Sequence, residues 1–160
     1  MLSKFYGKNS IILHRIFVHT ADNFAVSLIN KTIMEKEKVL QILDNLTKYR
    51  FVIGPLSRDD YGYIMDENEV VCFSHSSTDG IVIRIKEITN KLGEDLINTH
   101  NDYDRFIMII ECNPKNEMMM AEMEPIQDFY NRFIGCKKLL WGLSQHDDIE
   151  GVKITIVASK

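Results

Sequence analysis

The chain has 160 residues, of which 45% are hydrophobic and 26% are charged, and its net charge is −4. This length and composition are typical of one folded, soluble domain and exclude a disordered or fibrous protein. The 19 basic residues are interspersed with 23 acidic ones, which argues against nucleic-acid binding, because a surface that follows phosphates needs clustered cations.

The cysteines and the amino terminus indicate a cytoplasmic protein. Cys72, Cys112 and Cys136 lie in or beside apolar runs and form no CxxC pair, so we expect reduced, packed thiols. The first ten residues lack the apolar region of a secretory signal peptide, and no apolar run approaches the length of a membrane span. We therefore expect no association with a membrane.

Two segments among the first fifty residues carry clear patterns. Residues 10–19 (SIILHRIFVH) have apolar side chains at both parities, which predicts a strand buried on most of both faces. Residues 24–33 fit either the return strand of a hairpin or the start of a long helix, and we favour the hairpin. Residues 35–49 predict a helix with one apolar face, formed by Val39, Ile42, Leu43 and Leu46.

Residues 50–77 contain one weak and one strong strand pattern. Residues 50–58 are a short apolar run that Gly54 and Pro55 interrupt, so this run cannot continue as a central strand. Residues 59–69 (DDYGYIMDENE) are expected to be a loop or a weak edge strand. Residues 69–77 (EVVCFSHSS) predict a strand that ends in small and polar residues.

The segment at residues 80–100 decides the topology. Its first residues are β-branched and suit a strand by residue type, but apolar residues then recur four, three, four and four positions apart: Ile81, Ile85, Ile88, Leu92 and Leu96. This spacing places them on one face of a helix. We therefore predict a helix, with Thr78 or Asp79 as its N-cap and Gly93 as a weak point.

The last third of the chain predicts a strand, a helix and two strands. Residues 106–111 (FIMIIE) are apolar at both parities, as in a central strand covered on two faces. Pro125 suits the first position of the helix and Gly135 suits its end. Residues 136–145 and 152–159 are the two closing strands, joined by a charged turn. The buried face of the helix is expected to comprise Ile126, Phe129, Tyr130, Phe133 and Ile134.

These elements predict an α+β fold, with helices packed on one or both faces of a mixed sheet. We expect a single domain over residues 1–160. Within it, residues 1–68 are an added strand or hairpin with a helix, and residues 69–160 are the core.

The order of elements in residues 69–160 resembles the C-terminal domain of the FtsZ and tubulin superfamily. In that family a strand and a long helix lead to a central strand, and a second helix that opens near an acidic residue precedes two final strands. In this chain Glu124 is the counterpart of that acidic residue. Gly142, Ser144 and Asp147 resemble the family's G-x-S-x-D stretch, and VKITIVAS at 152–159 resembles its closing strand V-x-V-T-V-V-A.

The departures from the family pattern bear on function. The 160 residues contain neither a G-G-G-T-G-[ST]-G phosphate loop nor the catalytic N-x-D-x-x-D spacing. Asp59, Asp60, Asp66 and Glu67 are expected to precede a strand rather than enter a helix, so the family's catalytic role is not assigned to them. The resemblance thus implies an isolated C-terminal-type domain. We expect no cofactor, no binding of GTP by this chain, and a role in self-association or in pairing with a cytoskeletal or cell-division polymer.

Two groups of residues are candidate sites. His146, Asp147, Asp148 and Glu150 crowd into five positions and could hold a divalent cation, although a solvated turn, in which Asp147 or Asp148 bonds its own backbone, is the interpretation that we favour. Met118, Met119, Met120 and Met123 form a flexible, polarizable segment suited to binding a protein partner. Met residues also fill gaps in cores, but in an extended connector at least one of these should be exposed.

The alternative function is a small-molecule-binding protein or enzyme with a site at a subunit interface. This hypothesis expects a pocket in which Arg84, Arg105 or Arg132 meets a His or Glu. His75, beside several serines, could be a general base, but no sequence spacing identifies an acidic partner for it. No residue is assigned a catalytic role.

Overall fold

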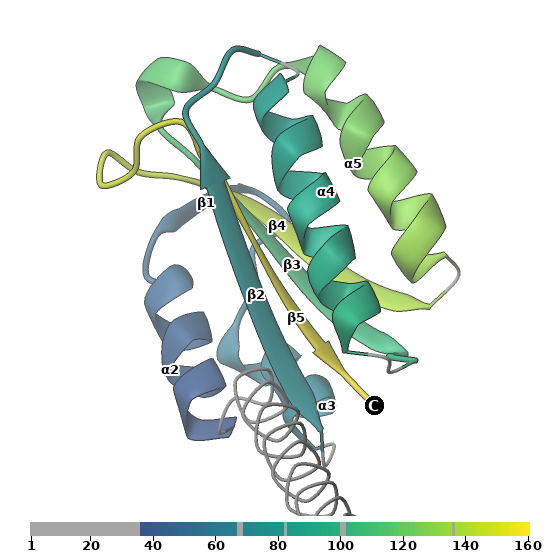
Figure 1. Cartoon of the computed structure of the whole chain (residues 1–160). Coiled ribbons are helices and arrows are strands. Elements are labelled where there is room, and N and C mark those ends of the chain that lie inside the picture. Colours follow the sequence, from purple (N-terminus) through teal and green to yellow (C-terminus); the bar gives the residue numbers. More distant parts are fainter. Residues whose placement is uncertain (1–35, 67–68, 82, 100–101, 136) are drawn as a thin grey trace, which may run out of the picture. The chain divides into compact units, whose positions relative to one another are not determined.

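The computed structural model describes residues 36–66, 69–81, 83–99, 102–135 and 137–160. The strand predicted at 10–19, the choice between strand and helix at 24–33, and Cys136 lie outside these residues. The described residues form a five-stranded mixed sheet with helices on both faces (Figure 1). The predicted α+β class is therefore confirmed.

The sheet has the strand order β1-β4-β3-β5-β2. Neighbouring strands are antiparallel except for β3 and β4, which are parallel. The last two strands of the sequence are thus not paired with each other, because β3 lies between them. The strand bounds are β1 (Arg50–Ile53), β2 (Val70–Ser77), β3 (Arg105–Cys112), β4 (Lys138–Gln145) and β5 (Val152–Ser159).

One face of the sheet is covered by α4 (Ile83–Asn98) and α5 (Met123–Phe129) (Figure 1). Four members of the predicted apolar stripe of α4 are buried against the sheet: Ile85, Ile88, Leu92 and Leu96. Ile81 is 49% exposed, because the helix begins at Ile83. The prediction of a helix is confirmed, but Thr78 and Asp79 lie too far before its start to cap it.

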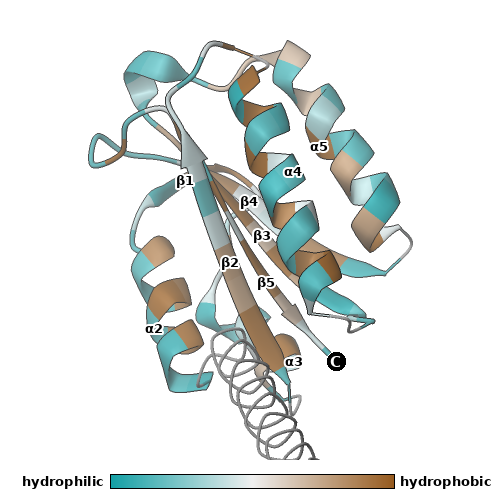
Figure 2. Cartoon of the chain, viewed as in Figure 1, coloured by the Kyte–Doolittle hydropathy of each residue, from teal (hydrophilic) through white to brown (hydrophobic). Residues whose placement is uncertain are grey.

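The opposite face is covered by α2 (Lys36–Leu46) and α3 (Arg58–Met65). The hydrophobic side of α2 faces the sheet (Figure 2), and the predicted apolar residues Val39, Leu43 and Leu46 are buried there. From the sheet, Ile107, Ile109 and Val157 complete this second core.

The prediction of a loop or edge strand at 59–69 is wrong, because α3 occupies most of this segment. The Ser57 amide and hydroxyl both donate to Asp60 Oδ2, at 2.7 and 2.9 Å, which caps the start of the helix. These bonds hold the pKa of the Asp60 carboxyl below its usual range. Tyr61 and Ile64 supply the buried side. Asp59 and Asp60 therefore do enter a helix, contrary to expectation, whereas residue 67 lies outside the described residues.

The helix predicted from Pro125 begins two residues earlier, at Met123, and continues as a π-helical turn η3 (Tyr130–Ile134). Ile126, Phe129 and Ile134 are buried, as predicted. Gly135, with φ of 60°, ends the helix. Gly93 does not weaken α4, because the Phe133 ring packs directly against it. A Cβ at position 93 would lie only 2.6 Å from the nearest atoms of that ring.

A buried ion pair anchors the connector between β3 and α5. The Arg84 guanidinium donates to Glu122 through Nε at 2.6 Å and Nη2 at 2.8 Å, and both side chains are 0% exposed. Arg84 also donates to the carbonyls of Asn116 and Glu117. The 3-10 turns η1 (Pro114–Asn116) and η2 (Met120–Glu122) are thereby held against α4.

Candidate functional site

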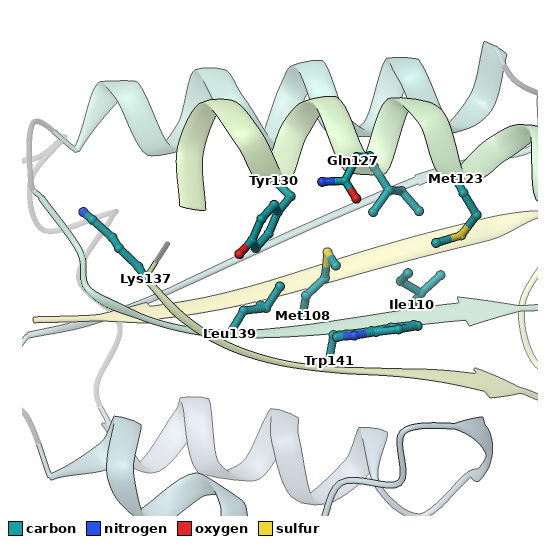
Figure 3. A pocket seen from close by; sticks show the side chains of 9 residues that line it. Met108, Ile110, Met123, Gln127, Tyr130, Lys137, Leu139 and Trp141 are labelled. Carbon is teal, nitrogen blue, oxygen red and sulfur yellow. The ribbon is translucent and has the colours of Figure 1, made fainter. Parts of the chain in front are cut away.

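A groove lies between α5 and the β3–β4 part of the sheet (Figure 3). The groove exists because α4 packs over β2 and β5, which leaves β4 less covered on this face. Its volume is about 390 Å³, within the range of pockets that hold ligands. Trp141 of β4 is 36% exposed. The groove is lined by Met108, Ile110, Met123, Ile126, Gln127, Tyr130, Lys137, Leu139 and Trp141.

The methionine segment runs into this groove. Met119 is 52% exposed and Met120 is 87% exposed, whereas Met118 and Met123 pack partly against the core, and Met123 also lines the groove (Figure 3). The expectation that at least one of these residues is exposed agrees with this arrangement. Their role in binding a partner stays a prediction.

The candidate cation ligands form a different structure around a buried carboxylate. Glu111, at the end of β3, is 2% exposed, and His146 Nε2 lies 3.0 Å from its Oε1. Lys153 of β5 lies 3.0 Å from Oε2 as an ion pair. The Tyr49 ring stacks on His146 with 3.7 Å between centroids, and its hydroxyl donates to Asp148 at 3.1 Å. We call these five residues the Glu111 cluster.

The Glu111 cluster includes two of the predicted residues, His146 and Asp148, whose nearest ring-nitrogen-to-carboxylate distance is 3.9 Å. No contact brings Asp147 or Glu150 into it. In the described parts of the chain, no three His, Cys, Asp or Glu residues are arranged to hold a metal ion. The hydrogen bond from Tyr49 raises the pKa of that phenol. The arrangement is suited to joining β3, β5, the turn after β4 and the residue before β1.

The structure supplies His75 with the acidic partner that sequence spacing did not reveal. Its Nε2 lies 2.6 Å from Asp95 Oδ2 on α4. The neighbouring Ser74 hydroxyl instead bonds Thr155 at 2.9 Å, and successive side chains of a strand point to opposite faces. His75 is therefore not aligned with Ser74 as a base with a nucleophile.

The three arginines named for the alternative function lie in different parts of the structure and contact different groups. Arg84 does meet a carboxylate, Glu122, but both are fully buried and offer no open pocket. Arg105 donates to the Tyr63 carbonyl. Arg132 lies over the Phe133 ring, 5.3 Å from its centroid.

Two cysteines are poor nucleophiles. Burial raises the pKa of the Cys72 thiol to about 11, and burial also raises the pKa of Cys112. Because the thiolate is the reactive form, both behave as packing residues.

The structure explains why position 142, in the G-x-S-x-D stretch, is a glycine. A Cβ there would lie 2.4 Å from the Gly54 carbonyl oxygen and 2.6 Å from the Phe51 ring. Only glycine lets β1 approach β4 this closely. Ser144, paired with Glu111 across the parallel strands, is fully buried.

The comparisons with known proteins bear on the fold. No protein-family model matches the sequence, and no curated protein matches it. An empty FtsZ dimer from M. jannaschii matches with a TM-score of 0.54 and 16% identity, over 69% of this chain. The described fold is FtsZ-like. An FtsZ W319Y mutant from M. jannaschii matches with a TM-score of 0.49 and 15% identity, over 66% of this chain.

The resemblance inferred from the order of elements is thus confirmed for the fold, and the match covers a larger share of the chain than residues 69–160. The chain spans about a third of the FtsZ chain from the empty dimer, since the match covers 32% of that chain. Among the described helices, none is long and apolar enough to cross a membrane.

Proposed function

We propose that this chain is a non-catalytic interaction module that binds an FtsZ- or tubulin-like protomer and so regulates a cytoskeletal or cell-division polymer. The observation that carries the proposal is the FtsZ-like fold, which corresponds to 32% of FtsZ, in a chain without the phosphate loop. Such a chain would have the shape of part of a protomer without its own nucleotide site.

The surface between α5 and β4 supports this proposal. Trp and Met are enriched in protein interfaces, and Trp is frequent among residues that dominate binding energy. Here Trp141 lies in the groove, and Met119 and Met120 extend the exposed apolar surface beyond it. A stable interface buries about 1,600 Å² in total, so the contact must include both the groove and the methionine segment.

The test is co-sedimentation of the full chain with polymers of an FtsZ-type GTPase from the same source, in GTP. The variant Met119→Ser/Met120→Ser should weaken binding at least tenfold, because two large side chains lose their contact area. The matched control is Val52→Ser/Ile53→Ser, which removes two exposed apolar residues, 44% and 50% exposed, from β1. This control should bind as the unchanged chain does.

The only tryptophan provides a second measurement. Trp141 is the single Trp of the chain, so a partner that itself lacks Trp should change its fluorescence on binding. Sedimentation velocity of the chain alone measures self-association. Absence of co-sedimentation, or equal weakening by both double variants, would contradict the proposal. Self-association that the methionine variant abolishes, without binding to the polymer, would assign the groove to a second copy of this chain and also overturn it.

A further inference from the structure

A second recess, of about 210 Å³, lies between the end of α4, the π-turn η3 and the start of β3. Its apolar lining includes Leu96, Phe106 and Phe133. It shares only Lys137 with the groove of Figure 3. The recess is therefore a separate feature from the proposed partner site.

The backbone of α4 sets the position of one wall. The Phe133 ring rests on Gly93, where any Cβ would come within 2.6 Å of it. The same π-turn carries Arg132 into the lining. π-helical turns occur frequently at functional sites, and here the turn brings a cation and an aromatic ring to one recess.

One of the two cations that line the recess has no carboxylate partner among the described residues. Lys137 donates to the carboxylate of Asp102 and to the carbonyl of Tyr103, so its charge is compensated. Within the described part of the chain, Arg132 makes no ion pair, and its guanidinium lies over Phe133. Tyr103 is 3% exposed, and its hydroxyl is buried without a hydrogen-bond partner. Because this hydroxyl has almost no accessible surface, a ligand in the recess cannot reach it, and the cation open to a ligand is Arg132.

We infer that this recess binds a small carboxylate with an apolar body. The apolar lining takes the body, and Arg132 binds the carboxylate through charge-assisted hydrogen bonds. A dry cavity of about 150 Å³ holds a benzene-sized molecule. A recess of about 210 Å³ therefore admits a single ring or a short acyl chain that carries one carboxylate.

The experiment is an NMR titration of the full, isotope-labelled chain with benzoate and, separately, with its neutral analogue benzamide. Benzoate should cause saturable amide shifts at residues 96–97, 103–106 and 132–133, with a dissociation constant of about 1 mM, as expected for about nine non-hydrogen atoms. Benzamide should bind at least tenfold more weakly, because it lacks the charge.

Three variants assign the roles. Arg132→Gln should weaken benzoate binding about tenfold and leave benzamide binding unchanged. Tyr103→Phe should leave benzoate binding unchanged, because the hydroxyl that it removes is not accessible from the recess. The matched control Arg58→Gln removes a cation whose side chain is 77% exposed, on α3, and should change neither titration.

Three outcomes overturn the inference, and the first two are no saturable shift with benzoate and an Arg132→Gln variant that binds as the Arg58→Gln control does. Shifts confined to residues 139–141 would place the binding in the other groove and likewise overturn it. Binding of a polymer partner plays no part in this titration, so the two proposals fail independently.

Discussion

Among the described residues, two carboxylates are buried, Glu122 and Glu111, and they are compensated in different ways. Glu122 is held by Arg84 through two short hydrogen bonds and also accepts from the Met119 amide at 2.8 Å. Glu111 is held by His146 and Lys153, whose side chains are 10% and 36% exposed. In the second case the Ser144 hydroxyl and His146 Nδ1 have no hydrogen-bond partner among the described residues.

The difference indicates what each arrangement contributes. A buried ion pair gains little over apolar packing, but losing one partner leaves an uncompensated charge. The Arg84–Glu122 pair therefore acts as a closed clamp that fixes the methionine-bearing connector. The Glu111 cluster reaches solvent through Lys153, so the loss of one partner there can be relieved by water.

The largest expected effect is that of Glu122→Ala. This variant leaves the Arg84 guanidinium buried and unpaired, which should lower the free energy of unfolding by about 3–5 kcal/mol. Urea denaturation measures it. The double variant Arg84→Met/Glu122→Leu removes both charges and should recover much of the loss. If Glu122→Ala lowers the free energy of unfolding by less than about 1 kcal/mol, the Arg84–Glu122 pair does not differ from the Glu111 cluster in the way described.

Gly142→Ala sharpens the comparison by disturbing β1, which pairs with β4 beside the Glu111 cluster. The new methyl group would clash with the Gly54 carbonyl and the Phe51 ring, so we expect a loss of about 1–3 kcal/mol and faster hydrogen exchange in β1. The control is Gly62→Ala in α3, where no atom lies within 4 Å of the added Cβ. It should stabilise the protein by about 0.5–1 kcal/mol.

Glu111→Gln should cost about 1–2 kcal/mol, less than Glu122→Ala, because Lys153 can turn towards water. Thermal or urea unfolding of both variants under one condition tests this order. Asp148→Asn, at a side chain that is 73% exposed, should stay within about 0.5 kcal/mol of the unchanged chain. A Glu111→Gln loss equal to that of Glu122→Ala would show that both clusters are closed clamps.

The smallest effect concerns alkaline pH. Tyr63 donates to the Phe106 carbonyl at 2.7 Å, and burial raises its pKa to about 12. The folded state therefore holds this proton more tightly than the unfolded state, whose tyrosine pKa is about 10. By linkage, the stability that Tyr63 contributes is complete below pH 10 and declines as the pH rises towards 12.

Tyr63→Phe should flatten the decline in stability above pH 10, at a cost of about 1 kcal/mol at neutral pH. Denaturation midpoints at several pH values measure this. Burial also raises the pKa of Tyr61, so part of the slope should remain. An unchanged slope in the variant would exclude Tyr63 as a source of the pH dependence.

Apolar periodicity predicted the elements whose burial is extensive. The stripe of α4 and the apolar run of β3 are long enough for their pattern to outweigh local alternatives. Helix α3 was missed because it has only eight residues, contains Gly62 and buries only Tyr61 and Ile64, which is too few for a helical period. The available signal in the sequence was Ser57 followed three positions later by Asp60, which is the spacing of a capping box.

The candidate site depends on contacts that no local pattern encodes. The methionine segment was recognised by composition, but the groove beside it arises from α4 covering β2 and β5. Likewise, Glu111 meets Lys153 only because β3 lies between β4 and β5. Asp95 reaches His75 from a different element, twenty positions away in the sequence.

The place of β5 has a consequence for how the sheet assembles. Strand β5 pairs with β3 on one side and β2 on the other, so among the described strands β2 has no neighbour until residues 152–159 have been synthesised. During translation, β2 therefore stays unpaired until the most C-terminal strand of the sheet has been made. Removal of that strand alone would leave a three-stranded remnant, β1-β4-β3, and a detached β2, both prone to join the sheets of other chains.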